Sequence, residues 1–140
     1  MNTYSTSIRI SATPEKVWSV LVQDLPVDPV PFGVLRIEGA ISCNSRIKLW
    51  SEVDPKRAFA LKVRTFDAPK KMIWQGGMPF GLFTGTRTFE LSDFGGSTTF
   101  KMQEVFSGAL SGLIVKSIPD LTPSFEKFAQ ALKEKAENHE

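Results

Sequence analysis

The stretch that decides the fold is residues 83–106, FTGTRTFELSDFGGSTTFKMQEVF. Two runs in which apolar and polar residues alternate flank the cluster DFGG at 93–96. Alternation of this kind is typical of strands that bury one face, and aspartate and glycine are residues that tight turns favour. The stretch therefore predicts a β-hairpin with strands at 82–92 and 97–106 and a tight turn at Gly95-Gly96.

Two charged residues of this hairpin occupy otherwise apolar registers. Arg87 shares its strand face with phenylalanine and leucine, and Glu104 shares the matching face of the next strand with phenylalanine and methionine. A two-residue turn places Phe94 opposite Ser97, and the same register places Arg87 opposite Glu104. Because an isolated buried charge costs on the order of several kcal/mol, an inward arginine should pair with a carboxylate or a ligand anion. We therefore predict an Arg87–Glu104 pair on the concave face of the sheet.

Strand-like runs extend the sheet toward the N-terminus, and short turns separate them. The predicted strands lie at 4–10, 34–41, 45–53, 58–66 and 70–76, with turns at 43–45, 54–56 and 68–70. Such a succession favours an antiparallel meander.

Helical patterns interrupt the strands in two places. Thr13-Pro14-Glu15 predicts the start of a short helix that ends by Pro26, and the proline-rich segment 25–33 predicts an irregular crossing loop, either a connection or a pocket lid. After Phe106 the period becomes helical, with a break near Pro119. One apolar stripe then predicts a long C-terminal helix, capped by Thr122-Pro123 and followed by a frayed tail at 138–140. The stripe consists of Leu121, Phe125, Phe128, Ala129, Leu132 and Ala136.

Several segments resemble one known group of proteins. TPEKVW at 13–18, FTGTRTFEL at 83–91, GSTTF at 96–100, EVFSG at 104–108 and ALKEKAE at 131–137 are similar to the polyketide cyclase-like bacterial branch of the START and birch-allergen (SRPBCC) superfamily. The resemblance implies one α+β domain over 1–140 with the helix-grip fold. In that fold a curved antiparallel sheet of about seven strands surrounds a long C-terminal helix, with short helices after the first strand.

The resemblance also implies a cavity between sheet and helix, and lipids, sterols, polyketides or aromatic molecules as ligands. The chain departs from the branch at two positions, since Arg87 stands where His is frequent and Ala129 where Asn is frequent. Both changes remove polar groups that could serve catalysis, so no catalytic residue is assigned. The predicted ligand-binding residues are Arg87, Glu104, Trp74, Phe83, Phe89, Phe100, Met102, Phe125 and Phe128.

These residues allow two interpretations at this stage. The charge pair either contacts a ligand or only fixes the register of the hairpin, and the aromatic residues either line a pocket or fill a core. Tyr4 and Thr6 are inward candidates for orienting a ligand oxygen, or they are satisfied polar groups of the core. Since arginine stays protonated and is a poor base, the pair favours binding over proton transfer.

The net charge and the cysteine and histidine content argue against several classes of function. Seventeen basic residues are spread among fifteen acidic ones for a net charge of +2, which does not favour a nucleic-acid binder. A single cysteine, Cys43, excludes an internal disulfide, and with His139 as the single histidine neither a metal nor another cofactor is predicted. The first residues lack the pattern of a secretory signal, and no apolar run approaches the roughly eighteen residues of a membrane span, so we expect a cytoplasmic protein.

We therefore predict a protein that binds a small hydrophobic molecule. The alternatives are an enzyme of the polyketide cyclase or dehydratase type and a protein-interaction module like the co-chaperone relatives of this fold. The segment 74–82 carries three glycines, a proline and apolar side chains, which fits a pocket mouth, a homodimer contact or a plain loop.

Overall fold

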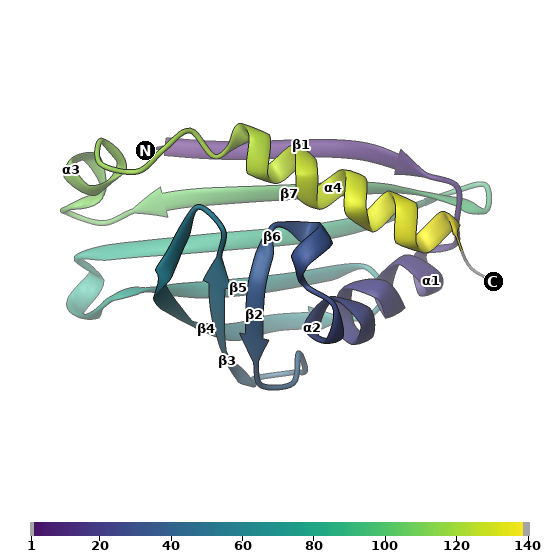
Figure 1. Ribbon diagram of the computed structural model, residues 1–140, viewed down its shortest axis with the longest axis horizontal. Helices are drawn as coiled ribbons and strands as arrows, with labels where there is room; N and C mark the ends of the chain where they lie inside the picture. Colours follow the sequence, from purple (N-terminus) through teal and green to yellow (C-terminus); the bar gives the residue numbers. More distant parts are fainter. Residues whose placement is uncertain (1, 139–140) are drawn as a thin grey trace.

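A curved antiparallel sheet holds a C-terminal helix on its concave face, as predicted (Figure 1). The computed structural model describes residues 2–138, so His139 lies outside the described residues. The sheet has seven strands in the order β1-β7-β6-β5-β4-β3-β2, and the final helix, α4, runs along β1 and β7 (Figure 1). The strands are β1 (Asn2–Ile10), β2 (Val34–Glu38), β3 (Arg46–Ser51), β4 (Asp54–Asp67), β5 (Lys71–Met78), β6 (Phe83–Phe94) and β7 (Ser97–Ser107). The α-helices are α1 (Pro14–Ser19), α2 (Leu25–Val27), α3 (Ser111–Val115) and α4 (Thr122–Glu137).

The first helical region starts where the sequence predicts and ends later. The Thr13 hydroxyl accepts a hydrogen bond from the backbone N–H of Lys16 at 3.3 Å, and Pro14 occupies the first turn. The chain then continues through a π-helical turn (Val20–Asp24) into α2, past the predicted end at Pro26. A 3-10 turn (Val30–Phe32) follows, so the predicted irregular loop is partly helical. The reason is that proline fits the first turn of a helix, and the fully buried Leu25 anchors that turn.

Several predicted strand boundaries are wrong: the strand predicted at 34–41 ends at Glu38, and two further differences have a clear physical reason. The turn expected at 54–56 lies at 52–53 instead, and Asp54 already pairs with Ser51. Pro55 is compatible with this position because proline is tolerated at the beginning of a strand. In addition, β5 runs through two glycines to Met78, so the loop expected at 74–82 shrinks to the 3-10 turn Pro79–Gly81. A Cβ at Gly77 would lie 2.1 Å from the carbonyl oxygen of Phe83, so only glycine fits there.

The C-terminal helix packs its predicted apolar stripe against the sheet. Phe128 lies at the centre, with its ring centroid 5.2 Å from that of Phe32, 6.0 Å from Phe89 and 6.3 Å from Phe100. The helix begins at Thr122, whose backbone N–H donates to the Asp120 carboxylate at 3.0 Å. Asp120 therefore supplies the capping interaction that we expected from Thr122.

The end of α4 is held by a pH-sensitive contact. One carboxylate oxygen of Glu137 accepts hydrogen bonds from Lys133 Nζ at 2.6 Å and from the backbone N–H of Ser11 at 2.7 Å. These bonds lower the pKa of Glu137 below its ordinary value of 4.5. A lowered pKa in the folded state stabilises the protein above the ordinary pKa, and this contribution is lost as the pH falls through the lowered value.

We expect Glu137→Gln to lower the melting temperature at pH 7 and to have a shrinking effect as the pH falls below 4.5. Thermal unfolding followed by circular dichroism over this pH range measures the effect. Glu134→Gln is the matched control, because it removes the same charge from a residue whose carboxylate, among residues 2–138, accepts a side-chain hydrogen bond from Gln130 of its own helix and none from another element. A difference between wild type and Glu137→Gln that is constant with pH would contradict this assignment.

Candidate functional site

The predicted charge pair forms on the concave face of the sheet. Phe94 lies opposite Ser97 in the hairpin, and Arg87 lies opposite Glu104, as the two-residue turn requires. Arg87 Nε donates to Glu104 Oε1 at 2.7 Å, and Arg87 Nη2 lies 2.6 Å from the same oxygen. The side chains of Arg87 and Glu104 are 24% and 13% exposed, so the pair is neither sealed in the core nor on the open surface.

Aromatic rings surround the pair on its inner side. The guanidinium carbon of Arg87 lies 4.8 Å from the ring centroid of Phe125, which reaches it from α4. Tyr4 of β1 lies opposite Glu104 in the sheet and packs against Phe125 at 6.3 Å and Phe106 at 6.2 Å. Tyr4 therefore points inward as predicted, and the half-buried Thr6 follows it on β1, opposite the buried Met102.

The geometry of the pair leaves hydrogen-bonding capacity unused. Both contacts from Arg87 end on the same carboxylate oxygen of Glu104. A guanidinium carries donors on all of its nitrogens, and within residues 2–138 Glu104 is the acceptor that Arg87 contacts. The remaining N–H groups of Arg87, including those of Nη1, can therefore donate to an oxygen that is not part of this chain.

A second unused donor lies on the adjacent strand. Trp74 of β5 pairs with Arg87 of β6 in the sheet and is buried. Its indole N–H has no hydrogen-bond partner among the described residues. Leaving a buried donor unsatisfied costs about 1–3 kcal/mol, so an acceptor that reaches Trp74 would recover free energy.

Gly85 makes room for the pair and was missed in the sequence. A Cβ at Gly85 would lie 2.9 Å from Glu104 Oε2 and 3.3 Å from Cε1 of Phe106. An isolated glycine within a strand is typical of a close approach by another group, which is the pattern that could have found it. The carboxylate of Glu104 thus occupies the space that a side chain at position 85 would fill.

We expect Gly85→Ala to lower the free energy of unfolding by about 1–3 kcal/mol, because the new methyl group overpacks the space beside Glu104. Urea unfolding measures the change. Gly112→Ala in α3 is the control, since nothing lies within 4 Å of a Cβ there, and alanine in place of a helical glycine should be neutral or stabilising. Equal effects of the two substitutions would contradict the assigned role of Gly85.

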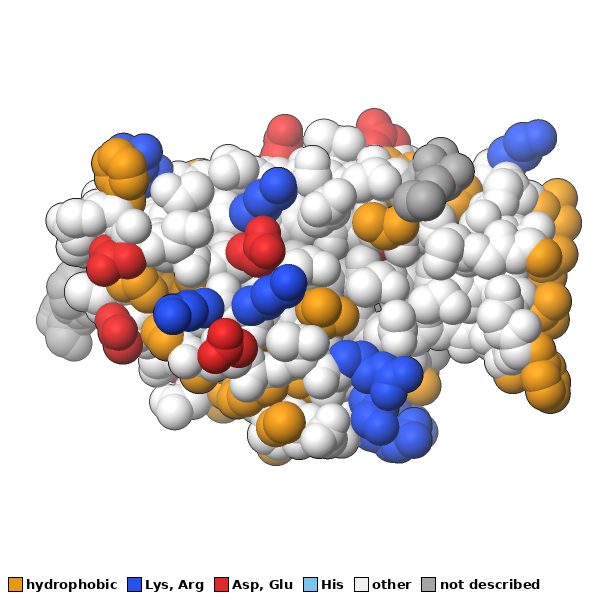
Figure 2. Space-filling view, turned by 180° about the vertical axis from the view of Figure 1, so that it is seen from behind, with side chains coloured by type: hydrophobic (Ala, Val, Ile, Leu, Met, Phe, Trp, Pro, Cys, Tyr) orange, Lys and Arg blue, Asp and Glu red, His pale blue; other side chains and the backbone are white. Residues whose placement is uncertain are grey.

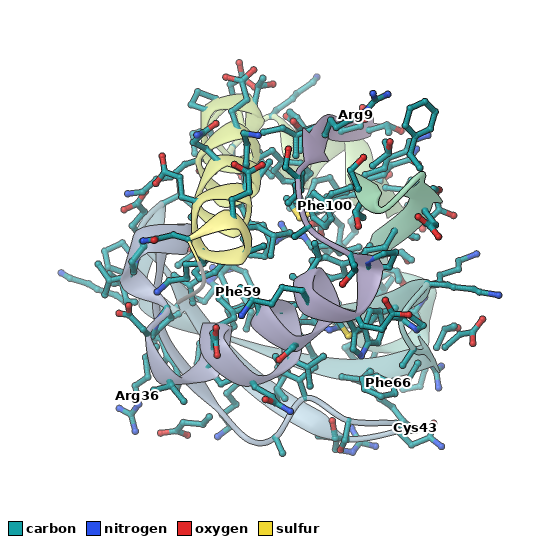
Figure 3. All side chains as sticks on the ribbon, turned by 90° about the vertical axis from the view of Figure 1, so that its right-hand side faces the viewer. Arg9, Arg36, Cys43, Phe59, Phe66 and Phe100 are labelled. Carbon is teal, nitrogen blue, oxygen red and sulfur yellow. The ribbon has the colours of Figure 1, made fainter. Side chains whose placement is uncertain are left out.

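The predicted ligand-binding residues fall into two groups by depth. The first group is buried and forms the core between sheet and helix; Figure 3 shows one of its members, Phe100, in that interior. The second group is partly exposed to solvent. The buried residues are Trp74, Phe89, Phe100, Met102, Phe125 and Phe128, and the partly exposed ones are Phe83, Arg87 and Glu104.

Two hollows of about 540 and 590 Å³ lie on the outer face of the sheet. Arg46, Lys62 and Gln75 line both of them. Along β3, β4 and β5 these residues neighbour the buried Ile47, Val63 and Trp74, so they point away from the core. Figure 2 shows lysine and arginine side chains gathered on this face. Sequence analysis missed this gathering because its members come from separate strands.

The described part of the chain contains neither a cluster of metal ligands nor a membrane-spanning helix. Residues 2–138 contain no group of three or more His, Cys, Asp or Glu side chains arranged to hold a metal ion. None of the helices described here is long and apolar enough to cross a membrane. Cys43 is a free, exposed thiol on the turn between β2 and β3, at the periphery in Figure 3.

Comparison with known proteins connects the chain to solved structures through its fold. No protein-family model matches the sequence, and no curated protein matches it. The Aha1 dimer from Colwellia psychrerythraea is similar with a TM-score of 0.73 and 21% identity, covering 99% of this chain and 98% of that chain. Truncated norcoclaurine synthase from Thalictrum flavum has a TM-score of 0.71 and 16% identity over 99% and 95% of the two chains. Protein MLL2253 from Mesorhizobium loti has a TM-score of 0.72 and 16% identity over 95% of each chain. At these identities the likeness establishes the fold.

Proposed function

We propose that this chain, which has the helix-grip fold, binds a small, largely apolar molecule whose oxygen-bearing group contacts Arg87. The observation that carries the proposal is the partly exposed Arg87–Glu104 pair within an aromatic wall. Ligand sites commonly combine apolar walls with a few polar groups that fix orientation, and the residues around Arg87 are of these types.

The unused donors define the polar part of the ligand. Glu104 holds Arg87 through one oxygen only, so an acceptor oxygen can bind the free N–H groups without breaking the pair. Hydrogen bonds from a charged donor are stronger than those between neutral groups, and a desolvated site strengthens them further. A hydroxyl, carbonyl or carboxyl oxygen would satisfy this requirement.

The surrounding rings define the apolar part. Phe83 is partly exposed and stacks on Phe106, with ring centroids 5.5 Å apart and planes inclined by 14°. Tyr4 also packs edge-on against Phe106. Flat aromatic faces next to a guanidinium suit an aromatic or polycyclic group, and they also suit an aliphatic chain. Lipids, sterols, polyketides and aromatic molecules are therefore the ligand classes to test.

The fold neighbours differ in kind, since norcoclaurine synthase is named as an enzyme and Aha1 is described as a dimer. One fold can support unrelated functions, so the proposal rests on the site. The site supports binding more than catalysis because its paired arginine is a poor base.

Isothermal titration with a matched series of 2-naphthoate, 2-naphthol and naphthalene tests the proposal. We expect the two oxygen-bearing probes to bind more tightly than naphthalene and to raise the melting temperature in proportion to the logarithm of their concentration. The same thermal-shift measurement with a fatty acid, a sterol and an aromatic polyketide then identifies the ligand class. Equal affinity of the three naphthalene probes would contradict the role of Arg87, and absence of binding throughout the panel would contradict the function.

A further inference from the structure

One end of the molecule exposes apolar side chains from two segments that lie together. At the end of β5 and in the β5–β6 loop, Phe80 is 94% exposed and Met78 and Leu82 are also exposed, while Leu113 of α3 is 70% exposed. The backbone N–H of Leu110 donates to the carbonyl oxygen of Leu82 at 2.8 Å, which ties the two segments to each other. We call Met78, Phe80, Leu82 and Leu113 the apolar end, and Figure 2 shows apolar side chains along this edge, at the right of the view.

The apolar end lacks charged residues over a long stretch of chain. Neither 76–86 nor 105–115 contains a lysine, arginine, aspartate or glutamate. Phe80 also has a φ of 62°, in the left-handed region that is unfavourable for a bulky residue. A contiguous apolar surface of this kind is typical of an interaction site, and the fold holds Phe80 outward at a cost in backbone strain.

A group of unpaired cations adjoins the apolar end. Arg46, Lys48, Lys62 and Arg64 lie on the outer face of the sheet, and none forms an ion pair with a carboxylate of residues 2–138. We call these four residues the basic cluster. The hollow of about 540 Å³ is lined by three residues of the basic cluster and also by Met78 and Pro79. The basic cluster and the apolar end are therefore continuous.

Other charged residues near the basic cluster are paired, unlike the four residues of the cluster itself. The carboxylate that lines the neighbouring hollow, Glu38, is bound by Arg36, and farther along the same face Lys71 pairs with Glu90 at 3.9 Å. In Figure 2 acidic and basic side chains alternate over the left part of this face, whereas the basic side chains at the lower right stand together. The basic cluster thus presents uncompensated positive charge beside an uncharged apolar surface.

We propose that the apolar end and the basic cluster together dock on the surface of an anionic lipid bilayer. Apolar side chains without charges can enter the headgroup region, and adjacent lysine and arginine side chains are attracted to anionic headgroups. A second copy of the chain fits less well, because a symmetric contact through the same surface would bring the basic clusters of both copies close together. The inference goes beyond the proposed function and does not depend on it.

Co-sedimentation of the full chain with large vesicles tests the proposal. We expect binding to vesicles of phosphatidylcholine mixed with phosphatidylglycerol, weak binding to phosphatidylcholine alone, and release as the salt concentration rises. Arg46→Gln/Lys62→Gln/Arg64→Gln should weaken binding about five-fold for each charge removed. Phe80→Ser should weaken it about ten-fold or more by removing the most exposed apolar side chain.

Matched controls separate this surface from general effects of charge and hydrophobicity. Arg57→Gln/Lys70→Gln/Lys101→Gln removes the same charge from outside the basic cluster, and Phe94→Ser removes an exposed ring at the β6–β7 turn, at the other end of the sheet (Figure 1). Retained circular dichroism spectra establish that each variant folds. Equal loss in the variants and their controls, or no binding to anionic vesicles at low salt, would overturn the proposal. Phe80-dependent self-association in light scattering without vesicle binding would also overturn it, in favour of a second copy.

Discussion

Phe128→Ala is expected to lower the free energy of unfolding by about 3–5 kcal/mol, the largest loss of stability that we predict. Phe128 is buried and contacts the rings of Phe32, Phe89 and Phe100, so its removal leaves a cavity where α4 meets the sheet. The loss combines the transfer of apolar surface with the cavity that the surrounding rings cannot fill. Urea unfolding with far-ultraviolet circular dichroism measures it.

Phe80→Ala is the control for this experiment. It removes the same side chain from a position that is 94% exposed, and surface substitutions usually change stability by no more than about 0.5 kcal/mol. A loss below about 1 kcal/mol for Phe128→Ala would mean that α4 is not packed on the sheet in solution as it is in the structure.

Arg87→Met is expected to weaken binding of 2-naphthoate about ten- to hundred-fold, which corresponds to the loss of one or two hydrogen bonds from a charged donor. Methionine retains apolar contact with Phe125 but donates no hydrogen bond. The advantage of the two oxygen-bearing probes over naphthalene should also disappear, because no donor would then meet their oxygen and the unpaired Glu104 would repel the carboxylate of 2-naphthoate. Isothermal titration of wild type and variant measures both effects.

The same substitution leaves Glu104 without its partner in a site where its side chain is 13% exposed. Stability should therefore fall by about 1–3 kcal/mol, less than for a fully buried pair, and Arg87→Met/Glu104→Gln should recover part of the loss. Arg9→Met is the matched control because Arg9 also lies over a phenylalanine ring, at 4.0 Å from Phe94, but on the outer surface. Unchanged affinity of Arg87→Met for 2-naphthoate would contradict the assigned role of Arg87.

The features that sequence analysis predicted correctly are those that short-range rules determine. A two-residue turn fixes hairpin register, so the position of the turn at Gly95-Gly96 was sufficient to place Arg87 opposite Glu104. The helical stripe around Phe128 likewise follows from local periodicity. Both features required only residues close in sequence.

The features that it missed depend on contacts between distant segments. The helical region passes Pro26 because Leu25 is buried in the core, and burial can outweigh local turn propensity. Strand β5 continues through Gly76 and Gly77 because β6 approaches too closely for a side chain at position 77. Neither contact can be deduced from the composition of the segment alone.

The depth of the candidate site residues also depends on the complete fold. Alternation correctly identified which side chains face inward, but it could not separate Phe89, deep in the core, from the partly exposed Phe83 on the same strand. The basic cluster was missed for a related reason. Arg46 and Lys62 are far apart in sequence and become neighbours only through the register of β3 with β4.

Native mass spectrometry of the protein, purified gently from its own cells, is the most direct test of the central claim that the Arg87 site holds a small apolar molecule. The account predicts that wild type carries a non-covalent adduct with an oxygen-bearing apolar group, and that Arg87→Met, purified in parallel, carries much less of it. Folded wild-type protein without an adduct, which also fails to bind any compound of the probe panel, would contradict the claim. An adduct that Arg87→Met retains in full would contradict the location of the site.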